Sequence, residues 1–139
     1  MDIQLTRNNE SVHLTATNSD GNEVNLDGSP SIGGKGLGAR PMELVLMGLG
    51  GCSSMDVLSI LEKMKVKLES YDVKVHADRD TDAVPSLFTD IHVEYIITGQ
   101  EKDRAKIEKA INLSMDKYCS VTKILESTAK ITHSLTLNN

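Results

Sequence analysis

The sequence predicts a domain of the α+β class with the element order βββ-α-ββ-αα-β. Three observations lead to this prediction. Short segments near both ends alternate apolar and polar residues, which is typical of half-buried strands. One long central segment is apolar on nearly every helical face, and a later segment carries an apolar stripe at helical spacing. With 139 residues, 39% of them hydrophobic, we expect a single domain over residues 1–139.

The N-terminal part of the chain alternates as three short strands, which we expect at residues 2–7, 11–17 and 22–26. Residues 27–39 follow and contain a cluster of glycines. Because glycine is conformationally permissive, we expect a mobile loop here. Long loops in compact domains are often functional.

A long helix is predicted to begin at Pro41, which suits a first helical turn, and to run to about Lys65. A helix that is apolar all round is buried. One chain of this size offers too little cover, so we expect a homodimer whose two central helices share one core. The alternative is a monomer whose sheet wraps the helix. Glycine, serine and acidic residues interrupt the apolar segment, so we do not expect it to span a membrane.

The C-terminal part predicts two strands, two helical segments and a last strand. The strands are expected at 73–80 and 88–98, an amphipathic helix at 103–117, a second helical segment at 120–127 and the final strand at 130–137. The helical pattern breaks at Tyr118 and Cys119.

Composition excludes several classes of function. The chain has 15 basic and 20 acidic residues, a net charge of −5, and only 3% aromatic residues, so we expect no nucleic-acid partner. The N-terminus lacks a basic start followed by an apolar stretch, and we expect a cytoplasmic protein. Two cysteines are too few for a zinc site unless a histidine or carboxylate completes it, and we expect no metal and no cofactor.

The two cysteines are the candidate reactive groups. Cys52 lies in the middle of the long helix among glycine and serine residues that leave space around its sulfur. Cys119 lies near the start of a helical segment, a position that lowers the pKa of a thiol. If the two sulfur atoms lie within disulfide reach, a two-cysteine redox cycle becomes available. The alternative for each cysteine is an inert buried thiol.

Two charged residues bear on the reactivity of Cys52. Asp56 follows Cys52 by one helical turn, and a carboxylate there opposes thiolate formation. We therefore expect Asp56 to be turned aside or paired with a cation, for which the candidates are Lys123, Arg40 and Lys35. Arg40 precedes the helix and lies roughly 16 Å from Cys52 along it, at ~1.5 Å per residue, so a contact between them is expected across a dimer. The alternative is a solvated loop arginine.

Two segments, GARPMELVLMGLGGCSSMDV at 38–57 and DKYCSV at 116–121, resemble the OsmC/Ohr family of organic hydroperoxide reductases, and its YhfA-type branch in particular. The resemblance covers almost the whole chain. It implies an intertwined homodimer with two long central helices and two equivalent sites at the subunit interface. By position it implies that Cys52 attacks the hydroperoxide and becomes a sulfenic acid. Cys119 then resolves this acid to a disulfide, which a dithiol reductant, often lipoyl-linked in this family, reopens.

The expected function is thiol-dependent reduction of organic hydroperoxides in oxidative-stress defence, with Arg40 as the cation beside the attacking sulfur. The expected binding residues lie along the same helix and are Met42, Glu43, Leu46, Met55 and Asp56. In characterised peroxidases of the family a glutamate directly follows the helix-opening proline, whereas here Met42 does and Glu43 comes one place later. Two alternatives stay open: a non-catalytic OsmC-like dimer that binds a small apolar or thiol-containing ligand, and a structural dimer with inert thiols.

Overall fold

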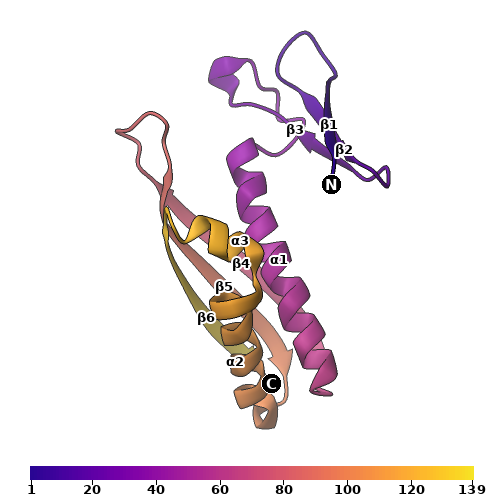
Figure 1. Ribbon diagram of the computed structural model, residues 1–139, viewed down its shortest axis with the longest axis vertical. Coiled ribbons are helices and arrows are strands. Elements are labelled where there is room, and N and C mark those ends of the chain that lie inside the picture. The colour runs from indigo at the N-terminus through magenta and orange to yellow at the C-terminus, as the bar shows by residue number, and fades with distance from the viewer. The chain divides into compact units, whose positions relative to one another are not determined.

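The computed structural model describes all residues from Met1 to Asn139, which form two compact units, Met1–Val45 and Leu46–Asn139. The units contain two three-stranded sheets and three α-helices, in the predicted order along the chain (Figure 1). The predicted α+β class is therefore confirmed. The long helix α1 (Pro41–Lys63) begins in the first unit and continues through the second.

The first unit is built on an antiparallel meander of three strands, namely β1 (Ile3–Arg7), β2 (Leu14–Asn18) and β3 (Glu23–Leu26). β2 begins later than predicted because the chain turns before it. The side chain of Asn9 accepts hydrogen bonds from the backbone N–H groups of Ser11 (3.0 Å) and His13 (3.2 Å). These bonds hold the backbone in a local turn that competes with strand pairing.

The glycine-rich segment at residues 27–39 is organised around one carboxylate, although a mobile loop was expected there. Asp27 is 3% exposed, and its carboxylate accepts hydrogen bonds from the N–H groups of Gly28 (2.8 Å), Lys35 (3.0 Å) and Leu37 (3.0 Å). The backbone N–H of Asp27 also donates to the carbonyl of Ala39 (3.0 Å). One acidic side chain therefore holds both ends of the loop, and the N–H of Leu37 is the largest cause that lowers the pKa of Asp27.

Replacing Asp27 by alanine is expected to loosen this loop, because three backbone N–H groups lose their common acceptor. Trypsin should then cleave after the exposed Lys35 several-fold faster than in the unaltered protein, as followed by mass spectrometry of the fragments. Asp20→Ala is the matched control, since Asp20 lies in an exposed turn of the same unit. Equal cleavage rates in the two variants would show that Asp27 does not order the loop.

The second unit contains a mixed sheet with the order β4-β5-β6. Its strands are β4 (Leu68–Arg79), β5 (Phe88–Gly99) and β6 (Lys130–Asn138). β4 and β5 are antiparallel, whereas β5 and β6 are parallel and are connected through α2 (Arg104–Leu113), a π-helical turn (Ser114–Tyr118) and α3 (Ser120–Leu125). A tight turn leaves the next strand antiparallel to the first. Two parallel strands therefore need a longer crossover connection. β4 starts earlier than predicted, through a register irregularity between Leu68 and Ser70.

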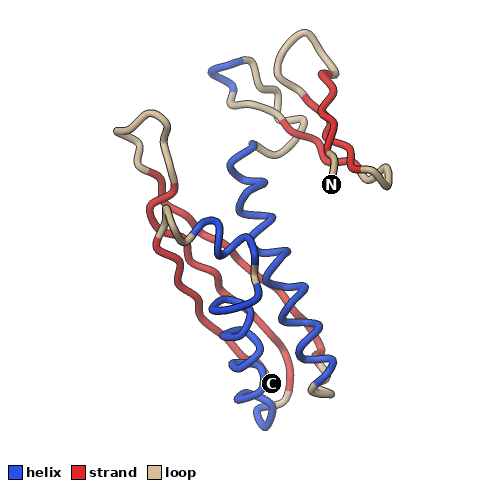
Figure 2. Tube along the Cα trace, in the orientation of Figure 1, coloured by secondary structure: helices blue, strands red, loops and turns tan.

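The helices of the second unit cover one face of this sheet (Figures 1 and 2). The covered face and the helices supply the core, in which the largest fully buried side chains include Tyr95, Leu49, Leu61, Ile91, Ile97, Ile107 and Ile111. Gly50 lies close to the sheet, since a Cβ there would meet a methyl group of Val75 at 3.3 Å. The glycine therefore permits close approach of helix and sheet.

One face of α1 is buried and another apolar face is exposed. Leu49 and Val57 are completely buried, whereas Met47, Met55 and Leu58 are 56%, 70% and 41% exposed. The prediction that this helix is buried on every side is therefore not met within one chain, because a single sheet covers only one side of a helix. Length and composition alone would let α1 cross a membrane, and the core helix of a soluble protein meets the same criteria.

Candidate active site

The structure brings three of the predicted site residues together in the second unit. The sulfur atoms of Cys52 and Cys119 and a carboxylate oxygen of Asp56 all lie within 4.8 Å of one another. Cys52 is half-buried, Cys119 is completely buried, and both are free thiols. A disulfide would need the two sulfur atoms to close to about 2.0 Å. The two thiols are therefore neighbours, although they lie far apart in the sequence.

Local structure sets the position of Cys119. The helical segment that follows β5 ends in the π-helical turn, and Cys119 leaves it with extended backbone angles (φ −71°, ψ 107°), so the predicted break at Tyr118 and Cys119 is present. Its backbone N–H donates to the carbonyl of Ser114 at 2.8 Å. Its sulfur accepts a hydrogen bond from the N–H of Thr122 at 3.4 Å and thereby caps α3. Both bonds anchor the thiol on rigid backbone.

Burial decides the direction of the pKa shift at Cys119. The sequence predicted a lowered pKa from the helix start, and hydrogen bonds from Thr122 do act in that direction. Burial is the larger influence and raises the pKa of the Cys119 thiol, and the neighbouring Cys52 raises it further. The prediction of a lowered pKa was therefore wrong, because burial disfavours the thiolate more strongly than the hydrogen bonds from Thr122 favour it.

Asp56 is held by a hydroxyl group rather than by a cation. The hydroxyl of Ser114 donates to the Oδ2 atom of Asp56 at 3.2 Å. Lys123, one of the cations expected to pair with Asp56, instead forms an ion pair with Glu126 at 3.0 Å. That part of the prediction was wrong, since Lys123 points along the exposed side of α3.

Behind Asp56 a chain of buried hydroxyl groups crosses the core. The hydroxyl of Ser53 is hydrogen-bonded to that of Ser114 (3.0 Å) and to that of Tyr95. Burial is the main cause that raises the pKa of Tyr95, and the acidic groups of Cys119 and Asp56 act in the same direction. The carboxylate of Asp56 is therefore connected, through Ser114 and Ser53, to the hydroxyl of Tyr95 on the sheet.

The remaining predicted residues have other positions. Arg40 and Glu43 belong to the first unit, where a carboxylate oxygen of Glu43 accepts a hydrogen bond from the backbone N–H of Arg40 at 2.9 Å. Glu43 thus caps the N-terminus of α1, as acidic residues at the third helical position commonly do. Arg40 itself is exposed, Met42 and Leu46 are half-buried, and Met55 is exposed on α1.

A second tyrosine lies beside the hydroxyl chain and makes the stability of the protein sensitive to alkaline pH. The hydroxyl of Tyr71 donates to Ser54 at 3.1 Å, and its ring packs edge-on against Tyr95. Burial is the main cause that raises the pKa of Tyr71 from 10.0 to about 12. The folded state therefore retains the Tyr71 proton more strongly than the unfolded state does, and the stability from this group is lost as the pH rises from about 10 to 12.

Tyr71→Phe is expected to flatten this alkaline loss of stability, because the variant has no ionisable group at position 71. The melting temperature should fall less between pH 9 and 11.5 in Tyr71→Phe than in the unaltered protein, whatever its value at neutral pH. Tyr118→Phe is the control, since the Tyr118 side chain is 50% exposed. If both variants lose stability with pH as steeply as the unaltered chain, Tyr71 does not carry the effect.

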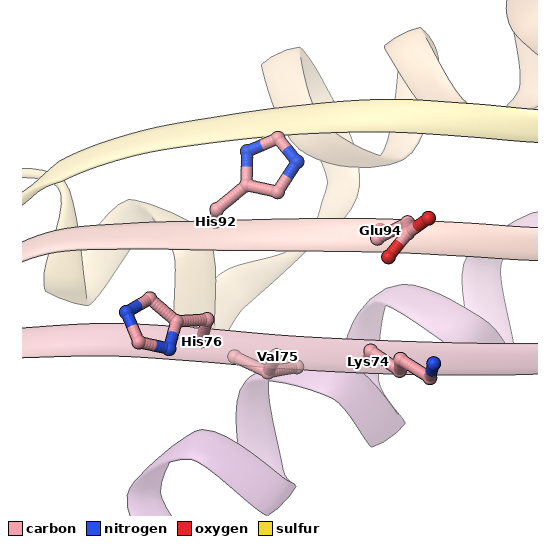
Figure 3. A pocket seen from close by; sticks show the side chains of 5 residues that line it. All are labelled: Lys74, Val75, His76, His92 and Glu94. Carbon is pink, nitrogen blue, oxygen red and sulfur yellow. The ribbon is translucent and has the colours of Figure 1, made fainter.

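The opposite face of the sheet offers a weaker candidate site. An open depression there is lined by Lys74, His76, His92 and Glu94, with Val75 between them on β4 and its side chain turned toward α1 (Figure 3). The ring nitrogens of His92 already have partners, the hydroxyls of Thr132 (2.7 Å) and Ser134 (2.9 Å) on β6. The imidazole of His92 therefore belongs to cross-strand polar pairs on a solvent-facing surface.

Comparison with known proteins identifies the family. A family model described as "OsmC-like protein" matches residues 33–134, which is more than half of the chain. Protein YhfA of Escherichia coli strain K12 is 39% identical over 125 residues, with 90% of each chain covered. The chain therefore belongs to the OsmC-like family. The predicted relationship to the OsmC/Ohr family and its YhfA-type branch is confirmed.

Solved structures of OsmC-like proteins share the fold. The OsmC-like protein of Mycoplasma pneumoniae superposes with a TM-score of 0.82 at 21% identity, over 99% of this chain and 96% of that one. The organic hydroperoxide resistance protein OsmC of Legionella pneumophila gives 0.70 at 16% identity, with 97% and 95% covered. OhrB of Bacillus subtilis, also an organic hydroperoxide resistance protein, gives 0.63 at 16% identity, with 97% and 96% covered. The fold is thus shared with organic hydroperoxide resistance proteins.

The hydroxyl groups of this OsmC-like site were missed by the sequence analysis. Ser114 follows Ile107 by seven positions and Ile111 by three, so helical periodicity places it on the buried face. A polar serine at a position where helical periodicity predicts an apolar residue was the signal that could have singled out Ser114. The signal for Ser53 and Tyr95 was weaker, because the sequence does not show which strand residue a given helix residue will contact.

Proposed function

We propose that this OsmC-like protein reduces organic hydroperoxides in oxidative-stress defence, with Cys52 and Cys119 as its redox pair. The observation that carries the proposal is the closeness of two free thiols on backbone fixed by α1 and by the cap of α3. Membership of a family that includes organic hydroperoxide resistance proteins supports it. The proposal places the protein in the cytoplasm, where the reducing environment regenerates thiols.

Exposure supports the proposed roles of the two cysteines. Cys52 is half-buried and Cys119 is completely buried, so a substrate from solvent meets Cys52 first. The raised pKa of Cys119 keeps it as a thiol while Cys52 reacts, and a thiol is a poor nucleophile. Cys52 is accordingly the attacking residue and Cys119 the resolving residue.

The proposed reaction has two steps. The thiolate of Cys52 attacks the terminal oxygen of the hydroperoxide, the O–O bond breaks, and the leaving alkoxide takes a proton to become an alcohol. Cys52 is then a sulfenic acid. The sulfur of Cys119 attacks that of Cys52, the S–S bond forms, the S–O bond breaks, and the departing hydroxide takes the proton of the Cys119 thiol and leaves as water. An external dithiol, lipoyl-linked in the proposal, reduces the disulfide.

The thiolate of Cys52 needs a cation beside it, and no ion pair of the second unit provides one at Asp56. The ion pairs of this unit join other residues, namely His76–Asp78, Arg104–Glu101, Arg104–Glu108 and Lys123–Glu126. Arg40 of a second copy of the chain remains the cation that we propose, since its side chain is exposed. This assignment requires a homodimer.

The exposed apolar face of α1 supports the proposed homodimer. Met47, Met55 and Leu58 expose apolar side chains along one helix, and a Cβ added at Gly48 or Gly51 would meet nothing within 4 Å. Open space beside small residues lets a second helix approach closely. A second α1 helix, packed against the first, would bury the apolar side chains that one sheet leaves exposed.

Counting thiols after exposure to a hydroperoxide tests the proposed reaction. The reduced protein receives one equivalent of cumene hydroperoxide, and free thiols and intact mass are followed over minutes. Both thiols of each chain should disappear, the mass should fall by two hydrogen atoms, and cumyl alcohol should appear in equal amount. A chain that keeps both thiols under these conditions has no such activity.

Asp56 favours a second candidate function, a non-catalytic dimer that binds a small apolar or thiol-containing ligand. The carboxylate lies within 4.8 Å of both sulfur atoms and would place a like charge beside any thiolate formed there, which opposes attack on a hydroperoxide. The thiol count separates the two functions, because a binding protein retains its thiols after exposure to the hydroperoxide.

A further inference from the structure

We infer that the reduced protein binds one thiophilic divalent cation of the zinc class, with the sulfur atoms of Cys52 and Cys119 and a carboxylate oxygen of Asp56 as its ligands. This metal site goes beyond the proposed hydroperoxide chemistry and does not depend on it. It rests on three features of the second unit: the geometry of the three ligand atoms, their charge, and the hydrogen bonds that orient them.

The three ligand atoms are arranged as a small triangle on two fixed elements. Each of them lies within 4.8 Å of the other two. Zinc lies about 2.3 Å from thiolate sulfur and about 2.0–2.2 Å from carboxylate oxygen, so the ligand atoms around it are roughly 3.5–4 Å apart. Cys52 and Asp56 lie one turn apart on α1, and the three atoms must move together by only about 1 Å to reach this separation.

The charges of the cluster favour a cation. Two ionisable thiols and a carboxylate meet here, and the nearest lysine of α3, Lys123, is paired with Glu126. A divalent ion supplies the missing positive charge and displaces one proton from each thiol, so that two protons are released as the two metal–sulfur bonds form. Thiolate ligands select zinc over magnesium or calcium, which prefer oxygen.

Groups behind the ligands are arranged as outer partners of a metal site. The hydroxyl of Ser114 donates to the Oδ2 atom of Asp56 at 3.2 Å, which leaves the other carboxylate oxygen free. The N–H of Thr122 donates to the sulfur of Cys119 at 3.4 Å. Such bonds orient first-shell ligands and are typical of metal centres. Three protein ligands leave the fourth tetrahedral position for water.

Occupation of this site and the redox cycle exclude each other. The ion holds both thiolates, so neither sulfur is available to a hydroperoxide while the ion is bound. A disulfide between Cys52 and Cys119 removes two of the three ligands. Zinc therefore inhibits thiol oxidation, and oxidation releases zinc.

Cobalt(II) is the probe for this site, because its spectrum reports sulfur ligation and tetrahedral geometry. The reduced, full-length protein is titrated with Co²⁺ without oxygen, and Zn²⁺ is then added. We expect one equivalent of Co²⁺ per chain, a sulfur-to-cobalt charge-transfer band, and displacement by Zn²⁺. Asp56→Asn should weaken binding by at least ~10-fold, since loss of an outer partner alone weakens metal sites by that amount.

Asp78→Asn is the matched control, because Asp78 lies beside the exposed His76 at 3.3 Å and would serve an adventitious surface site. It should bind Co²⁺ as tightly as the unaltered protein. Cys52→Ser should lose about half of the charge-transfer intensity if it still binds, and circular dichroism verifies that each variant is folded.

Three results would overturn the metal site: a spectrum without sulfur ligation, unchanged affinity in Asp56→Asn, or lost binding in Asp78→Asn. The same protein without added metal then receives cumene hydroperoxide. Loss of its thiols leaves the proposed function standing even where the metal site fails, and retention of its thiols removes that function without touching the metal site.

Discussion

Cys52→Ser is expected to abolish hydroperoxide consumption. The rate should fall by at least about 10³-fold, because a serine hydroxyl does not ionise near neutral pH and the remaining thiol, Cys119, is completely buried. The measurement is consumption of cumene hydroperoxide by the reduced protein in the presence of an excess of a dithiol. Serine differs from cysteine by one side-chain atom, so the variant should keep its fold and its oligomeric state.

Cys119→Ser separates attack from resolution and serves as the matched control. It leaves Cys52 able to react once, so one equivalent of peroxide should be consumed per chain. The sulfenic acid should then accumulate, detectable by mass spectrometry after trapping with dimedone. Turnover at the unaltered rate in both variants would show that the two cysteines do not have the proposed roles.

Met55→Glu is expected to separate the proposed dimer into monomers. The Met55 side chain is 70% exposed in one chain and lies on the apolar face of α1. In a dimer built on that face the new carboxylate would be buried without a partner, which costs about 3–5 kcal/mol and weakens the dimer by at least ~100-fold. Sedimentation velocity over a range of protein concentrations measures the shift from dimer to monomer.

Ile124→Glu is the control for this substitution. The Ile124 side chain is also 70% exposed and apolar, but it lies on α3 rather than on α1. It should leave the dimer intact, which separates the effect of position from the effect of added charge. A dimer that survives Met55→Glu, or an unaltered protein that is monomeric, would contradict an interface on this face.

The local pattern of the sequence predicted most of the fold. Alternation and helical periodicity located the strands and helices, and Pro41 marked the first residue of α1. The start of β4 was missed because residues 68–72 are mostly polar and pair through a register irregularity. The ordered structure of the loop at 27–39 was also missed. Asp27 holds this loop through the backbone N–H groups of Lys35 and Leu37, and every residue except proline has such a group, so the sequence gives no sign of these bonds.

The candidate site could be predicted only in part. The spacing of Cys52 and Asp56 places them one turn apart on any helix, so their closeness follows from the sequence. Ser114 and Tyr95, which connect Asp56 to the core, come from elements that the sequence does not pair with α1. The expectation that Lys123 partners Asp56 failed for the same reason, because the direction of a side chain depends on what packs beside it.

The sequence by itself determined the family, the order of the elements, and the two thiols with one carboxylate beside the first. Only the tertiary structure decided that Cys119 joins Cys52 and Asp56, and that its pKa is raised rather than lowered. The physical reason is the separation along the sequence between the residues that each property depends on. Helix and strand preferences depend on residues a few positions away, whereas burial and contact depend on segments that folding brings in from elsewhere in the chain.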